Sequence, residues 1–118
     1  FDVIIKKNYK GGVIAPGLKL SLNTLSYKAT LIPKINLKKI KKIIGNDTIS
    51  AVRSGFFWGY AGLIDNIVNL IKKETGASFK VVITGGLSDL FKTSIKTKVI
   101  QNKNITVKGL IKISKLIK

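Results

Sequence analysis

Cysteine and histidine are both absent from the 118-residue sequence. Without cysteine the chain has no disulfide framework and no thiolate metal site. Without histidine it lacks the commonest metal ligand and the commonest base at neutral pH. Acid–base chemistry must therefore use a lysine, one of five carboxylates or a group outside this chain, and we expect no metal site here. The carboxylates are Asp2, Asp47, Asp65, Glu74 and Asp89.

Negative charge is scarce, and the five acidic residues face 22 basic ones, for a net charge of +17. Such a balance is typical of proteins that bind nucleic acid or anionic surfaces. The densest basic cluster, KKIKK at 38–42, has no interleaved aromatic residues for base stacking. Arginine, the preferred base-reading residue, occurs once, as Arg53. We therefore favour solvated lysine faces and predict no specific nucleic-acid partner.

Long apolar runs are also missing, although apolar residues make up 45% of the chain and can form a core. The most apolar stretch, GFFWGYAGLIDNIVNLI, is interrupted by Asp65, Asn66 and Asn69, well short of the roughly 20 residues of a membrane span. We predict a cytoplasmic protein with no membrane partner. The first residue, Phe1, already lies in a strand-like run, so we expect the sequence to begin inside a sheet.

The N-terminal part predicts a hairpin and one helix. Residues 1–6 and 12–15 are expected strands, and the turn between them, 7–11, contains Gly11 for a positive φ. Apolar residues at 18, 22, 25 and 29 have helical spacing over 18–29. Pro33 ends that pattern, and 32–38 is expected to be extended or irregular. A short basic segment, 39–44, follows.

A long helix is predicted from Thr48 to about Lys73, with Asn46 or Asp47 as its N-cap and Gly76 as its C-cap. Three glycines, at 55, 59 and 62, lie on one stripe of this helix, where another element can approach closely. Two interpretations remain open and compatible: a central core helix, or a helix that packs one face in the core and another in a subunit interface.

The C-terminal part alternates strands and helices. Strands are expected at 80–84 and 96–100. A Gly85-Gly86 turn leads from the first of them into a short helix at 87–91, and a closing amphipathic helix is expected at 107–117. Alternation after an opening hairpin predicts an α/β fold with a mixed sheet and flanking helices.

Three motifs place small residues beside a strand or helix end, where a phosphorylated ligand can approach the main chain. In the last, VVITGGL (81–87), Gly85 and Gly86 follow a buried strand, and ligands in α/β sheets bind beyond strand carboxyl ends. A tight turn between strand and helix would equally account for these two glycines. In NDTISAVRSG (46–55), Thr48 can hydrogen-bond an anionic or hydroxyl-bearing ligand near the positive end of the helix dipole. Alternatively, Asn46 or Asp47 caps the helix and Thr48 is only its first residue. The first is YKGGVIAPG (9–17). Together they indicate a nucleotide-using α/β domain.

In this combination the residues resemble the C-terminal half of the type III pantothenate kinase family, whose members have the ribonuclease H-like fold of the actin-like ATPase superfamily. The resemblance covers nearly the whole chain. The matching segments are FDV (1–3), YKGGVIAPG (9–17), LNTLSYKATLIP (22–33), IGNDT (44–48) with SG (54–55), TGGL (84–87) and TVKGL (106–110).

The resemblance implies ATP-dependent phosphorylation of pantothenate to 4′-phosphopantothenate, the first step of coenzyme A biosynthesis. It implies a requirement for Mg²⁺ and for a monovalent cation, K⁺ or NH4⁺. It also implies a homodimer, which we expect to form through the long helix, 48–74. Carried over by position, Thr48 would contact pantothenate, and Thr84, Gly85 and Gly86 would bind the nucleotide. Tyr9 and Gly12 also match the family pattern, but we assign them only to the lining of the cleft or to a turn.

The chain departs from the family pattern at its start. The family's Asp-x-Gly-Asn-Thr phosphate loop and its Gly-x-Asp-Arg segment, with the catalytic aspartate, have no counterpart in 1–118. We therefore expect 1–118 to be a C-terminal actin-like domain truncated at its N-terminal edge, with no catalytic residue and no activity alone. Two alternatives remain: a basic domain that binds nucleic acid or an anionic surface, and a non-catalytic actin-like scaffold.

Overall fold

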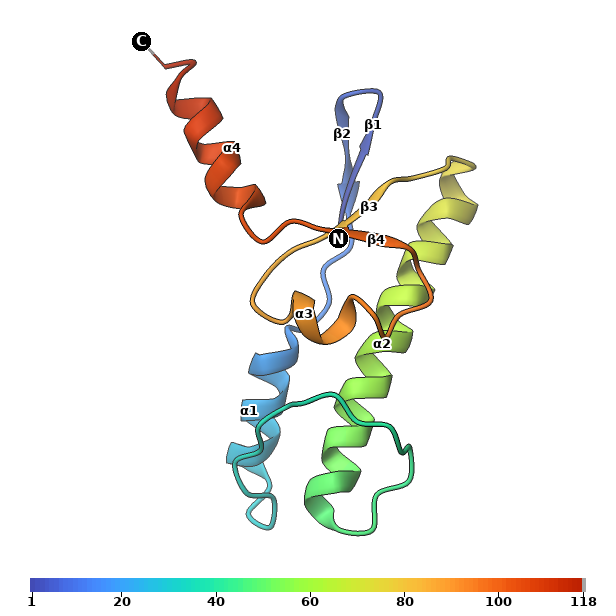
Figure 1. Cartoon of the computed structure of the whole chain (residues 1–118), viewed down its shortest axis with the longest axis vertical. Coiled ribbons are helices and arrows are strands. Elements are labelled where there is room, and N and C mark those ends of the chain that lie inside the picture. The colour runs from blue at the N-terminus through green and yellow to red at the C-terminus, as the bar shows by residue number, and fades with distance from the viewer. Residues whose placement is uncertain (118) are drawn as a thin grey trace. The chain divides into compact units, whose positions relative to one another are not determined.

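The computed structural model describes residues 1–117 (Figure 1). These residues fall into two compact units. The first unit is Phe1–Tyr60, and the second begins at Ala61. The boundary lies inside a single long helix, α2 (Thr48–Thr75).

The first unit opens with an antiparallel hairpin of β1 (Asp2–Ile5) and β2 (Asn8–Gly12). Its turn consists of Lys6 and Lys7, with φ of 50° and 67°. The prediction of a turn at 7–11 and a second strand at 12–15 was therefore wrong. A two-residue turn with positive φ matches the twist of the paired strands, and here two lysines adopt it without glycine.

The glycines of the hairpin serve the strand pair rather than its turn. Val3 pairs with Gly11 and Ile4 with Tyr9, so Lys10 is the extra residue of a β-bulge, beside which Gly11 has φ of 111°. A Cβ on Gly12 would lie 2.1 Å from the Phe1 carbonyl oxygen. Glycine at that position therefore permits the close approach of the two chain segments.

The core of the first unit lies between α1 (Leu18–Lys28) and the first half of α2. The predicted helix at 18–29 is confirmed to within one residue, and residues 29–47 form a loop. The Tyr60 hydroxyl donates to the Pro16 carbonyl oxygen at 2.9 Å and ties α2 to the segment before α1. The buried apolar side chains of this unit are Leu18, Leu22, Ile35 and Phe57.

Both predicted caps of α2 are confirmed. The Ser50 N–H donates to Asp47 Oδ1 at 2.8 Å, and the Asp47 N–H donates to Ser50 Oγ at 3.2 Å. This reciprocal pair satisfies two backbone donors at the helix start. At the other end Gly76 has φ of 63°, and its N–H donates to the Lys72 carbonyl oxygen at 3.0 Å.

The second unit contains a parallel pair, β3 (Val81–Ile83) and β4 (Val99–Gln101), joined through α3 (Ser88–Phe91). The strand predicted at 96–100 begins later, at Val99. The N–H groups of Lys96 and Thr97 instead donate to the Asp65 carboxylate of α2, both at 2.8 Å. The buried apolar residues of this unit are Ala61, Val68, Phe91 and Ile95.

The closing helix, α4 (Ile105–Ser114), starts two residues before and ends three residues before its predicted bounds of 107–117. No residue of α4 is buried, and Figure 1 shows it projecting from the end of β4. The predicted α/β class with an opening hairpin is confirmed. The antiparallel and parallel pairings of the described strands belong to two separate two-stranded sheets. Among residues 1–117, no helix is long and apolar enough to cross a membrane.

Candidate functional site

The predicted nucleotide residues Thr84, Gly85 and Gly86 lie directly after β3, and all three are exposed. Gly85 has φ of 99°, a conformation that other residues adopt only under strain. A Cβ on Gly85 or Gly86 would meet no heavy atom within 4 Å. The main chain of this turn is therefore open, and no bulky neighbour covers it.

A buried serine holds the turn in place. Ser88, 2% exposed, donates through its Oγ to the Gly85 carbonyl oxygen at 2.8 Å. Its backbone N–H donates to the same oxygen at 3.2 Å. Gln101 Nε2 in turn donates to Ser88 Oγ at 2.9 Å. Because Gln101 is the last residue of β4, the glycine turn is braced against the carboxyl end of the neighbouring parallel strand.

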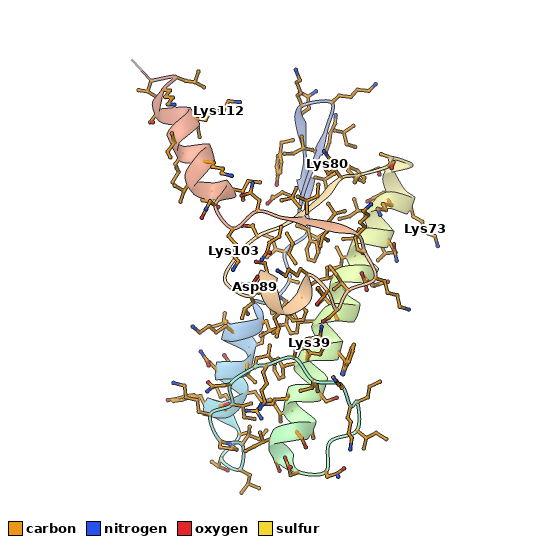
Figure 2. The ribbon with its side chains drawn as sticks, in the orientation of Figure 1. Lys39, Lys73, Lys80, Asp89, Lys103 and Lys112 are labelled. Carbon is orange, nitrogen blue, oxygen red and sulfur yellow. The ribbon has the colours of Figure 1, made fainter. Side chains whose placement is uncertain are left out.

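Asp89 adds a fixed negative charge beside this brace. Its carboxylate accepts a hydrogen bond from Gln101 Nε2 at 2.8 Å, pairs with Lys103, and lies 3.4 Å from Lys92 Nζ (Figure 2). The hydrogen bond from Gln101, reinforced by Lys103, holds the pKa of Asp89 well below its usual range. The carboxylate is therefore ionised at neutral pH and partly offsets the two lysines.

Ser88, Asp89 and Gln101 were missed in the sequence. Ser88-Asp89, one residue after the glycine pair, is a usable signal, because polar and acidic residues favour the first turn of a helix. Gln101 carries no such signal. Its role arises from the register that sets Gln101 opposite Ile83.

The predicted substrate residue, Thr48, is the first residue of α2 and is exposed. Asp47 caps the helix, which leaves the Thr48 side chain at the positive end of the helix dipole. The pKa of Asp47 is lowered mainly by the hydrogen bond from the Ser50 N–H and, to a smaller extent, by the Ser50 hydroxyl. Thr48 belongs to the first unit, and Thr84, Gly85 and Gly86 lie together in the second.

A hollow of about 450 Å³ lies beside the start of α2, between the helix and the preceding basic loop. Arg53, one of its walls, donates through Nε to the Asn36 carbonyl oxygen at 2.9 Å. The lysines of the KKIKK cluster are exposed, as expected for a solvated face, and three of them also line this hollow. The lining residues are Lys38, Ile40, Lys41, Lys42, Ile44, Gly45, Asn46, Asp47, Ser50 and Arg53.

The remaining candidate residues have local contacts. The Tyr9 hydroxyl donates to Asp2 Oδ1 at 3.3 Å across the hairpin, and Gly12 provides the close approach described above. Among residues 1–117, no three of the carboxylates gather into a group that could hold a metal ion.

A glycine turn at the carboxyl end of a parallel strand pair is where α/β proteins commonly bind ligands. The fold and this turn therefore define the class, an α/β protein with its main chain open at the ligand-binding end of a strand.

Comparison with known proteins identifies the family within that class. The family model described as type III pantothenate kinase matches residues 1–70. A type III pantothenate kinase of Pelagibacter ubique is 72% identical over all 118 residues, which cover 48% of that relative. One from Paramagnetospirillum magneticum is 40% identical over 114 residues, 96% of this chain and 44% of the relative. The chain belongs to the type III pantothenate kinase family, and it spans about half the length of these curated relatives.

Proposed function

We propose that this chain supplies the C-terminal half of an enzyme that uses ATP to phosphorylate pantothenate to 4′-phosphopantothenate in coenzyme A biosynthesis. The observation that carries the proposal is the 72% identity, over the full chain, to a relative named as this kinase. The catalytic groups of the reaction would lie in the other half of the protein. Residues 1–118 alone are therefore expected to show no turnover.

In this proposal Thr84, Gly85 and Gly86 bind the nucleotide. The support is physical: the two glycines present bare main chain, and Ser88 restrains the carbonyl of Gly85. A preorganised turn loses little conformational freedom when a ligand binds to it, which favours affinity. Thr48 contacts pantothenate, supported by its exposed position at the start of α2.

The proposal extends to fold and assembly. The domain has the actin-like, ribonuclease H-like fold and is cytoplasmic. Two copies pair through α2, 48–74, supported by the open stripe of Gly55, Gly59 and Gly62, where a Cβ would meet no heavy atom within 4 Å. Mg²⁺ and a monovalent cation, K⁺ or NH4⁺, are held mainly by residues outside this chain, because no three carboxylates of the described residues gather into a cluster that could hold a metal ion.

The test is pantothenate-dependent release of ADP by the full-length protein that contains this chain, with Gly86→Ala and Gly109→Ala as a matched pair. Both glycines have open space for a Cβ, and neither has a positive φ. We expect Gly86→Ala to raise KM for ATP at least tenfold, because the added methyl displaces the nucleotide from the main chain. Gly109→Ala, in α4, should leave KM unchanged.

A second pair tests the substrate residue. Thr48→Val should raise KM for pantothenate and leave KM for ATP unchanged, whereas Thr106→Val, at an equally exposed helix start, should change neither. A wild-type protein with no turnover of pantothenate would overturn the proposed activity. Equal kinetics for Gly86→Ala and Gly109→Ala would overturn the nucleotide assignment alone.

A further inference from the structure

We propose that the hollow beside the start of α2 binds the phosphate group of a small organic phosphate. The proposal concerns the first unit only. It does not rest on the kinase activity, although the lining residues Asn46, Asp47 and Ser50 flank Thr48, the proposed pantothenate contact, in the sequence. It accounts for the KKIKK cluster at 38–42, which the kinase assignment leaves without a role.

Charge is the first argument. Four cationic side chains, Lys38, Lys41, Lys42 and Arg53, line the hollow against one carboxylate, Asp47. Asp47 is already engaged, because its Oδ1 accepts the Ser50 N–H at 2.8 Å. The lining therefore carries a surplus of three positive charges within one concave surface. A monoanion would leave most of that surplus, whereas a phosphate dianion offsets more of it.

Geometry is the second argument. The Arg53 guanidinium is oriented by its Nε hydrogen bond to the Asn36 carbonyl oxygen at 2.9 Å. An oriented guanidinium matches the planar spacing of phosphate oxygens and binds them bidentately. Asn46 and Asp47 bring the first turn of a 28-residue helix to the same hollow, so its dipole adds favourable potential.

Size and apolar lining indicate the rest of the ligand. The hollow of about 450 Å³ is in the range of small-molecule sites and exceeds the size of an inorganic phosphate ion. Ile40 and Ile44 add apolar surface next to the lysines. No aromatic residue lines the hollow, so it lacks the stacking surface typical of nucleic-acid sites. These features favour a small organic phosphate over a polynucleotide.

The experiment titrates the ¹⁵N-labelled full-length protein that contains this chain with glycerol 3-phosphate as the probe. Acetate is the monoanion comparison and single-stranded DNA the polyanion comparison. We expect saturable shifts of the backbone amides at 45–50 and of Arg53 Nε–H. Lys41→Gln with Lys42→Gln should weaken the affinity about tenfold, from two charge-assisted contacts. The matched double variant Lys19→Gln with Lys28→Gln removes the same charge from the exposed side of α1 and should weaken it less than twofold.

Several results would overturn the proposal. One is non-saturating shifts spread over lysine-bearing segments throughout the chain, and another is equal weakening by the two double variants. Acetate binding as tight as glycerol 3-phosphate would argue against a phosphate site. DNA binding that is far tighter, per phosphate group, than the binding of glycerol 3-phosphate would assign the hollow to nucleic acid instead, if the double variant Lys41→Gln with Lys42→Gln also abolishes it. The single variant Lys42→Gln, with its spectrum checked for wild-type dispersion, covers the case in which a double variant unfolds.

Discussion

Replacement of Asp65 by alanine should loosen the loop that leads into β4. The Asp65 carboxylate, on α2, accepts the Lys96 N–H at 2.8 Å, the Thr97 N–H at 2.8 Å and the Thr97 hydroxyl at 2.6 Å. Partial burial raises the pKa of Asp65, but the hydrogen bonds from Thr97 and Lys96 outweigh it and hold the pKa below its ordinary value. The folded state therefore favours the ionised carboxylate as the acceptor.

The expected cost follows from these three bonds. Hydrogen bonds to a charged group each contribute about 1.5–3 kcal/mol when buried, but Asp65 is only half-buried, and water can replace part of the loss. Asp65→Ala should therefore lower the free energy of unfolding by about 2 kcal/mol. Thr97→Val, which removes the hydroxyl bond alone, should cost about 1 kcal/mol. The double variant should cost less than the sum, since both changes remove that same bond.

Urea denaturation followed by far-UV circular dichroism measures the free energies, and amide hydrogen exchange at Lys96 and Thr97 reports the loop directly. Asn66→Ala, at the neighbouring exposed position of α2, corrects for the change in helix propensity. The reasoning is refuted if Asp65→Ala stays within about 0.5 kcal/mol of wild type after that correction and both amides keep their protection.

Two further predictions concern the core and the response to acid. Phe57 is fully buried in the first unit, so Phe57→Ala should lower the free energy of unfolding by about 3–5 kcal/mol, whereas Phe56→Ala, at a half-buried position, should cost clearly less in the same urea series. Asp47, Asp65 and Asp89 all have lowered pKa values in the fold. Their contribution is therefore complete above the unfolded pKa of about 3.9 and is lost as pH falls through the lower folded values. Urea midpoints should stay flat from pH 7 to about 5 and fall below about pH 4. A midpoint that rises on acidification would contradict the sign.

Signals that act over a few residues could be read from the sequence. The caps of α2 depend on Asp47 with Ser50 at one end and Gly76 at the other, and both lie within one turn of the residues they satisfy. The helical spacing of Leu18 and Leu22 was likewise sufficient to locate α1. The order of the glycine and threonine motifs indicated the family, which the comparisons then showed.

Contacts between residues far apart in the chain were decided only by the tertiary structure. The predicted start of β4 was wrong because the Lys96 N–H donates to Asp65, 31 residues away, instead of to a neighbouring strand. The brace on the Gly85 turn depends on Gln101, which the parallel register sets opposite Ile83 and which donates to Ser88. The hollow arises because the loop at 38–42 folds back beside Arg53. Capping and periodicity are properties of neighbouring residues, whereas these contacts need distant segments to be brought together by burial of the core, and no local pattern encodes that.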